Sequence, residues 1–234
     1  MIEGHGACDS WIIYSSLSIL SRRCSLLVAS YASARPYLFH LTHRDNLNHI
    51  RDLARLFPAA VLMERAKQND LIRTLRRGPR QVSFDGRTIV IRDQDKLHRG
   101  NTGVPSGFTF EDLIETLNSR IFFWPGFIGG RPISYGIRHF ERYQNEKPAI
   151  IRIRFEALLA ANSGVVPRFC RYNSGSPRCS NGNRSPRGPD TFLLAPDFPE
   201  TPSKVVEVTF EQVIALPQDA QCGPTPEGPW RSLW

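Results

Sequence analysis

The stretch Tyr37–His43, "YLFHLTH", most constrains how this chain can fold, because it has the alternating pattern of a half-buried β-strand. Side chains of a strand point alternately to its two faces. Phe39 and Leu41 therefore share an apolar face, whereas His40 and Thr42 share the opposite face. Two polar groups on such a strand are either hydrogen-bonded residues at the border of a core or the floor of a cleft. The rest of the sequence has to separate these two interpretations.

Helical and strand patterns alternate along the chain, which predicts an α+β fold. Asp45 is expected to cap a helix that ends at Pro58, and residues 59–77 are expected to continue as helix. Asp85-Gly86, flanked by alternating apolar residues, predicts a hairpin with a tight turn.

The middle of the chain continues the same mixture. Thr109 and Asp112 have capping-box spacing ahead of a helix that leads directly into an aromatic strand. Further expected elements are a helix over 131–146, a strand over 149–155 with Arg152 and Arg154 pointing outward, and a short helix over 156–162.

Length and composition indicate one domain with extensions and favour a polyanionic partner. The chain has 234 residues, 41% of them hydrophobic, which is enough for one buried core. Its formal net charge is +8, and clustered Lys and Arg residues release counterions from nucleic-acid phosphates. The alternative is a basic protein without such a partner.

Cysteine usage and hydropathy bear on the cellular compartment. None of the five cysteines forms a Cys-x-x-Cys pair, and their odd number argues against a closed disulfide framework. We therefore expect a reducing compartment, the cytoplasm, and no metal site. No apolar run is long enough to span a bilayer, so we expect no membrane partner.

Three segments are expected: a leader over residues 1–34, a domain over 35–217, and a Pro- and Gly-rich tail over 218–234 outside the core. The leader is expected to be poorly ordered or helical. Its apolar runs are interrupted by serines, and Glu3 and Asp9 stand where a signal peptide carries positive charge. A signal-like leader and a wrongly assigned start both stay open.

A long basic loop over residues 170–202 precedes a strand over 204–210. The loop is rich in Ser, Gly, Asn, Pro and Arg, and it is either a functional loop or a disordered insertion. Glu207 is a carboxylate in the middle of the following strand. Glu211 shares its face by alternation, so the register alone does not separate the two carboxylates.

The order of these features resembles a known fold. A strand with His40 and Thr42, an aromatic strand led by Arg120 and a late strand with Glu207 are similar to the ADP-ribosyltransferase fold, in which split mixed or antiparallel sheets with flanking helices surround an NAD cleft. The stretch "LFHLTHRDNL" is similar to the H-x-T-H-x-x-N-L opening of DarT-like toxins, which use NAD to ADP-ribosylate nucleic acid.

Related uncharacterised bacterial proteins have counterparts of "LNSRIFFWP" and "YNSGSPR...RGPDTF", so the resemblance covers residues 37–217. One departure concerns the segment after the opening strand. DarT-like proteins have a glycine-containing turn there, which this chain replaces with "RDLARLFPAAVLMERA".

The resemblance implies an enzyme that takes NAD as substrate and modifies DNA or RNA, as the toxin of a toxin–antitoxin or phage-defence system with an antitoxin partner. Glu207 would stabilise the developing positive charge, with Arg120 as the first and Arg131 as the second candidate for the catalytic arginine. His40 would bind a ribose hydroxyl or the nicotinamide amide, and Thr42 would position the adenosine side.

The resemblance also suggests residues for the rest of the dinucleotide and for the acceptor. Phe123, Trp124 and Tyr135 are candidates for stacking on nicotinamide, and Arg120 or Arg131 could pair with the pyrophosphate. The loop residues that would contact the acceptor nucleic acid are Arg171, Arg178, Arg184 and Arg187. No Rossmann fingerprint or phosphate loop is present in the sequence, so a strand-lined cleft would bind NAD.

Two other functions are consistent with the same residues. One is a non-catalytic nucleic-acid-binding protein whose basic and aromatic side chains contact phosphates and bases. The other is an ADP-ribosyltransferase that modifies protein. The sequence does not separate them from the first function.

Overall fold

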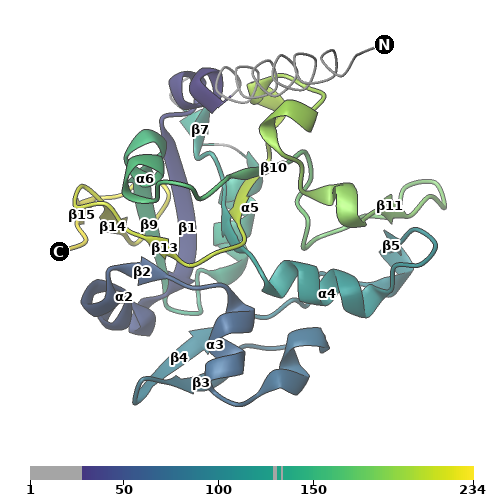
Figure 1. Ribbon diagram of the computed structural model, residues 1–234, viewed down its shortest axis with the longest axis horizontal. Coiled ribbons are helices and arrows are strands. Elements are labelled where there is room, and N and C mark those ends of the chain that lie inside the picture. Colours follow the sequence, from purple (N-terminus) through teal and green to yellow (C-terminus); the bar gives the residue numbers. More distant parts are fainter. Residues whose placement is uncertain (1–27, 129–130, 133) are drawn as a thin grey trace, which may run out of the picture.

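The structure is a computed structural model that describes residues 28–128, 131–132 and 134–234, and it is an α+β arrangement of small sheets flanked by short helices (Figure 1). The strands are β1 (Tyr37–His43), β2 (Arg55–Leu56), β3 (Arg80–Phe84), β4 (Arg87–Ile91), β5 (Thr102–Gly103), β6 (Ile121–Phe123), β7 (Phe127–Ile128), β8 (Arg131–Pro132), β9 (Pro148–Arg154), β10 (Arg168–Cys170), β11 (Ser185–Pro186), β12 (Glu207–Phe210), β13 (Ile214–Ala215), β14 (Gln221–Gly223) and β15 (Arg231–Ser232). The helices are α2 (Leu47–Leu53), α3 (Ala59–Arg65), α4 (Phe110–Asn118), α5 (Ser134–Tyr143) and α6 (Phe155–Ala161).

Strand β1 is an edge strand of an antiparallel sheet with the order β1-β9-β14-β15. Its seven residues pair with the whole of β9, and His40 lies opposite Ile151. The predicted faces are confirmed, because Leu38 enters the main core on one side while Phe39 and Leu41 enter a second apolar cluster on the other.

A three-stranded antiparallel sheet with the order β10-β12-β6 lies beside the first one. The two sheets are joined by a short backbone bridge between β1 and the end of β6. Phe39 N–H donates to the Trp124 carbonyl at 2.9 Å, and Trp124 N–H donates to the Phe39 carbonyl at 3.0 Å. The bridge brings the polar face of β1 next to β6 and β12.

The main core is formed by residues from both sheets. Leu38 and Ile153 from the first sheet pack in one cluster with Phe123, Val208 and Phe210 from the second. On the other side of β1, the Phe39 ring lies directly over Gly126. A Cβ built at Gly126 would lie 1.9 Å from a ring carbon of Phe39, so only glycine fits under this ring.

The hairpin β3–β4 and helix α3 form a lobe with a core of its own, at the bottom of Figure 1. The predicted turn is confirmed, since Asp85 and Gly86 both have positive φ, at 49° and 73°. Val82 and Ile89 of the hairpin pack on Met63 of α3, which is fully buried. We call this unit the satellite lobe, residues 57–92.

Three local predictions in this region were wrong. The helix expected to end at Pro58 ends at Leu53, because Ala54 takes a left-handed conformation, with φ of 50°, and Arg55–Leu56 form β2. Residues 59–77 do not form one helix, because α3 ends at Arg65 and Lys67 takes a left-handed conformation, with φ of 58°. The chain then forms a 3-10 helix (Asn69–Arg73) whose apolar residues fold back on the satellite core. Asp45 does not cap α2, because it lies inside a 3-10 turn that is capped by the His43 side chain.

The predicted capping box and the elements after it are confirmed. Thr109 and Asp112 cap α4 reciprocally, and the buried face of α4 delivers Asn118 to the start of β6. Helix α5 and the β9–α6 unit also have the predicted types. Arg154 is exposed as predicted. Arg152 differs, because its guanidinium lies over the Trp230 ring at 4.4 Å and donates to Gln221 instead of pointing into solvent.

The C-terminal tail is part of the fold, so the prediction that residues 218–234 lie outside the core was wrong. Strand β14 pairs with β9, and β15 pairs with β14. Ala220 and Leu233 are fully buried in the main core. The prolines of the tail form the connection between these short strands instead of preventing pairing.

The N-terminal prediction is tested only in part. Residues 1–27 of the expected leader lie outside the described residues. Residues 28–34 are helical, and Tyr31 and Ala32 belong to the main core, so the end of the expected leader is built into the domain.

The buried tail gives a stability prediction. Leu233→Ala should lower the free energy of unfolding by about 2–5 kcal/mol, because it leaves a cavity in the main core. Trp234→Ala, at a neighbouring residue that is 40% exposed, should change it by less than about 1 kcal/mol. Urea denaturation measures both values, and equal stability of the two variants would show that the tail does not contribute to the core.

Candidate functional site

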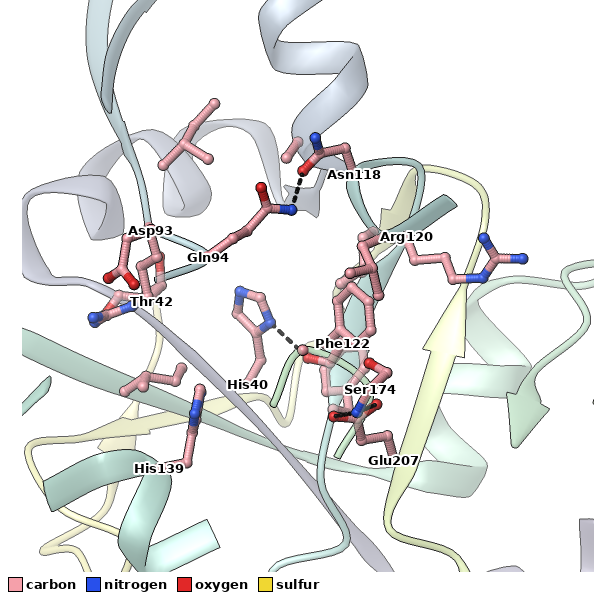
Figure 2. Close-up of a pocket in the computed structure, with 18 of the residues that line it drawn as sticks. His40, Thr42, Asp93, Gln94, Asn118, Arg120, Phe122, His139, Ser174 and Glu207 are labelled. Carbon is pink, nitrogen blue, oxygen red and sulfur yellow. Dashed lines mark hydrogen bonds between the residues drawn. The ribbon is translucent and has the colours of Figure 1, made fainter. Parts of the chain in front are cut away.

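A cavity of about 940 Å³ lies where the two sheets, α5, the satellite lobe and the basic loop meet. Its lining includes His40 and Thr42 of β1, Asn118 at the end of α4, His139 of α5 and Glu207 of β12. Figure 2 shows these side chains arranged around a common space. We call this cavity the cleft.

His40 lies at the centre of the cleft wall in Figure 2. Its Nδ1 lies 3.0 Å from the Phe122 carbonyl, which can only accept a hydrogen bond, so Nδ1 carries the proton. Burial lowers the pKa of His40 to about 4, opposed by this hydrogen bond and assisted by the charge of Arg92. His40 is therefore neutral at pH 7, and its Nε2 is a hydrogen-bond acceptor.

Glu207 is held at the start of β12, opposite Cys170 of β10. The Ser174 N–H donates to its carboxylate, at 3.2 and 3.3 Å from the two oxygens. Burial raises the pKa of Glu207 to about 7, and the Ser174 hydrogen bonds and the charge of Arg187 act in the opposite direction. A carboxylate with a pKa near neutrality is suited to accept a proton in a reaction.

Thr42 connects β1 to the satellite lobe. Its hydroxyl accepts a hydrogen bond from the Asn46 amide at 3.1 Å, and its carbonyl accepts one from Arg92 at 2.7 Å. Asn46 is also bonded to both backbone groups of Val90, each at 2.9 Å. Within the stretch "LFHLTHRDNL", His40 thus lines the cleft, whereas Thr42 and Asn46 hold the neighbouring strand β4 in place.

A buried polar network that was not predicted forms the opposite wall. Asn118 is 1% exposed, and its carbonyl oxygen accepts from Arg76 at 2.9 Å and from Gln94 at 3.1 Å. Arg76 also donates to the Arg92 carbonyl at 3.1 Å, and burial lowers the pKa of Arg76 to about 10. Asn118 lies in the quoted segment "LNSRIFFWP", but no local pattern predicts its partners, since Arg76 was placed within a predicted helix.

A second unpredicted cluster joins α5 to the end of β4. Arg142 donates to the buried Asp93 carboxylate at 2.6 Å, and the Arg92 guanidinium lies over the Tyr143 ring at 4.4 Å. Burial and Asp93 raise the pKa of Tyr143 to about 12. The cluster fixes α5 so that His139 lines the cleft. Burial also lowers the pKa of His139 to about 4.

Arg120, the first candidate for the catalytic arginine, points away from His40 in Figure 2. Its guanidinium donates to the Thr116 carbonyl at 2.6 Å and to Glu211, and it lies over the Phe192 ring at 4.5 Å. Glu211 is exposed and also pairs with Arg168 at 3.0 Å. Of the two candidate carboxylates, only Glu207 lines the cleft.

The aromatic candidates lie mostly in the core. Phe123 is 1% exposed and packs on Phe210 with a distance of 5.8 Å between the ring centres. The centre of the His40 ring lies 5.5 Å from that of Phe123. Trp124 lines the cleft but is stacked on Phe39 at 6.0 Å. The side chains of Arg131 and Tyr135 lie outside the described part of the structure.

The four loop arginines are in different environments. Arg178 and Arg184 are exposed, and Arg178 lines the cleft. Arg171 is exposed and pairs with Glu200 at 3.4 Å. Arg187, however, is only 4% exposed, so it does not lie on the surface where the other three could meet a large acceptor.

The cleft as a whole is strongly basic. Nine of its lining residues are Lys or Arg, namely Arg55, Arg76, Arg92, Lys96, Arg120, Arg138, Arg142, Arg178 and Arg187. Among the described lining residues only Asp93 and Glu207 are acidic, and Asp93 pairs with Arg142. Arg92, Lys96 and Arg120 pair with carboxylates outside the lining, which leaves Arg55, Arg76, Arg138, Arg178 and Arg187 without an ion pair among the described residues. Such a cleft attracts an anionic ligand.

The described residues contain neither a metal cluster nor a membrane span. Within them, no group of three or more His, Cys, Asp or Glu side chains could hold a metal ion. None of the helices in the same part of the chain has the length and apolar character needed to cross a membrane.

Fold and site together define an α+β protein with a basic cleft between two small sheets. Residues 36–220 match the profile of the family of unknown function DUF7002, and the chain belongs to this family. No curated protein and no solved structure is significantly similar to the chain.

The neutral histidines of the cleft predict acid sensitivity. The unfolded chain takes up each histidine proton near pH 6.5, but folded His139 takes it up only near pH 4. Between these values the unfolded state binds more protons, so the free energy of unfolding falls as the pH falls. His139→Gln removes one such group. Between pH 7 and pH 4, the wild type should lose up to about 3 kcal/mol more stability than His139→Gln in denaturation curves. Equal losses in the two proteins would contradict a buried neutral His139.

Proposed function

We propose that this protein transfers ADP-ribose from NAD to a nucleic acid and binds NAD in the cleft. The observation that best supports the proposal is that His40 of β1 and Glu207 of β12 line one cavity although they are far apart in sequence. The volume of about 940 Å³ is in the range of pockets that enclose ligands of cofactor size. The basic lining suits a pyrophosphate.

The chemistry of the transfer is compatible with the state of Glu207. The bond between nicotinamide and the ribose carbon breaks through an oxocarbenium-like transition state, and the nicotinamide nitrogen keeps the electron pair. The acceptor forms a new bond to the same carbon and loses a proton. An ionised Glu207 would stabilise the positive charge and take up that proton.

His40 would have a different part in the same reaction. With Nδ1–H donated to the Phe122 carbonyl, the neutral ring offers Nε2 as an acceptor for a ribose hydroxyl or an amide N–H. The low pKa of His40 keeps it from adding a further positive charge beside the developing cation. Its contribution would therefore be to orient the substrate.

The acceptor would approach from the side of the basic loop, where Arg178 and Arg184 are exposed. We propose that the protein acts in the cytoplasm, where NAD and nucleic acids are both present. A toxin with this activity would need an antitoxin partner to protect its own cell.

The central prediction concerns Glu207. Glu207→Gln should abolish transfer of label from NAD to DNA or RNA, with a loss of at least about 100-fold, because it removes the charge and keeps the volume. Glu211→Gln is the matched control and should keep most of the activity, since Glu211 does not line the cleft. Loss of activity in Glu211→Gln alone would reject Glu207 as the catalytic carboxylate.

A stability measurement shows whether Glu207→Gln is inactive for lack of folding. The pKa of Glu207 is raised from 4.5 to about 7, so ionisation of the folded state costs stability as the pH rises from 4.5 to 7. Between pH 4 and pH 8 the wild type should therefore lose up to about 3 kcal/mol more stability than Glu207→Gln.

The acceptor prediction concerns the exposed loop arginines. The double variant Arg178→Gln, Arg184→Gln should bind nucleic acid more weakly. It should also reduce the slope of log affinity against log salt by about one unit for each arginine that touches a phosphate in the wild type. The control is the double variant Arg154→Gln, Arg231→Gln, which changes two exposed arginines of the β1-β9-β14-β15 sheet, and it should have no such effect.

Filter binding over a salt series, beside a labelling assay, separates the alternatives. Nucleic-acid binding without transfer of label would indicate a non-catalytic nucleic-acid-binding protein. Label on protein together with an unchanged salt slope would indicate a protein acceptor.

A further inference from the structure

Arg187 is a buried arginine whose guanidinium is held by backbone carbonyls. It donates to the carbonyls of Pro186 at 2.8 Å, Asn173 at 2.9 Å and Ser174 at 3.3 Å, and it lies 4.6 Å from the centre of the Tyr172 ring. Within the described residues, no carboxylate lies within ion-pair distance of Arg187.

The same loop backbone contacts the candidate catalytic carboxylate. The carbonyl of Ser174 accepts a hydrogen bond from Arg187, and the N–H of Ser174 donates to both oxygens of Glu207. Ser174 itself is 1% exposed, so water does not compete for these groups. Arg187 and Glu207 are thus connected through one ordered residue.

We infer that Arg187 is a positioning residue, which holds the Asn173 and Ser174 carbonyls so that the Ser174 N–H orients the Glu207 carboxylate in the cleft. This role differs from a contact of Arg187 with the acceptor nucleic acid. Its effect on catalysis rests on the proposed function, whereas its effect on Glu207 does not.

Energetics support a role beyond filling space. Burial of a guanidinium costs several kcal/mol unless its donors are satisfied, and burial lowers the pKa of Arg187. Backbone carbonyls satisfy the donors but do not cancel the charge, so the positive charge of Arg187 still acts on Glu207. An apolar residue of similar size would lose both the hydrogen bonds and this field.

Among the described residues, the other groups around Glu207 do not supply a comparable charge. Cys170, which faces Glu207 across the strand pair, is fully buried, and burial raises the pKa of its thiol so that the thiol stays neutral. The neighbouring strand β6 contributes Phe122 and Phe123, which do not titrate. Arg187 is therefore the main basic group that acts on Glu207 from the loop.

The test measures Glu207 directly. The pKa of the Glu207 carboxyl is followed by carbon-13 NMR, with Glu207→Gln identifying the signal, in the wild type, Arg187→Met and Arg187→Lys. Arg184→Met, an exposed arginine of the same loop, is the control. We expect the Glu207 pKa to rise by about one unit in Arg187→Met, to rise less in Arg187→Lys, and to stay unchanged in Arg184→Met.

Kinetics give the second readout. In the labelling assay, Arg187→Met should lower kcat about 10- to 100-fold with KM for NAD within about threefold, and the pH at which the rate is half-maximal should rise with the Glu207 pKa. Arg187→Lys keeps the charge and covers the case in which Arg187→Met does not fold.

The outcomes separate this inference from the proposed function. An unchanged Glu207 pKa in folded Arg187→Met, or in Arg187→Lys if only that variant folds, would overturn the positioning role. A raised Glu207 pKa in a protein without transferase activity would keep the positioning role and reject the proposed function. A loss of nucleic-acid affinity with an unchanged Glu207 pKa would overturn the positioning role and indicate that Arg187 contacts the acceptor nucleic acid.

Discussion

The backbone bridge between Phe39 and Trp124 is the interaction on which the rest of the structure depends. It lets a single strand, β1, pair with β9 over its whole length and still contact the end of β6. The two sheets therefore meet with their apolar faces in one core. Because side chains alternate along β1, the burial of Phe39 on one side requires that His40 faces the other, into the cleft.

The cleft combines buried groups that are kept neutral with arginines, of which Arg120 and Arg142 are in ion pairs and Arg76 and Arg187 are not. His40 and His139 are neutral because burial opposes their protonation, and Glu207 has a pKa near neutrality for the same reason. The arginines around them keep their charge, and Arg76 and Arg187 donate to amide or carbonyl oxygens. The cleft lining keeps an excess of positive charge, which favours the entry of an anion.

How much could be predicted from the sequence depended on whether a pattern was local. The alternation of β1, the Asp85-Gly86 turn and the Thr109/Asp112 capping box are set by neighbouring residues, and all three are confirmed. The strand pairing of the tail depends on contacts with β9, and the Asn118 network depends on residues from three separate segments. Tertiary contacts of this kind leave no periodic pattern in the sequence. The burial of Arg187 could not be predicted either, because backbone carbonyls hold its guanidinium and every residue type has such a carbonyl.

The satellite lobe has a consequence for how the cleft could open. Its apolar core around Met63 is separate from the main core. Its links to the rest combine hydrogen bonds, among them Asn46 to Val90 and Arg76 to Asn118, with a few apolar contacts such as Leu75 on the α4 cluster. Hydrogen bonds of this type contribute on the order of 1 kcal/mol each, far less than an apolar core of the main domain. One wall of the cleft thus has a core of its own, so local unfolding of that unit would widen the cleft while the central sheets remain intact.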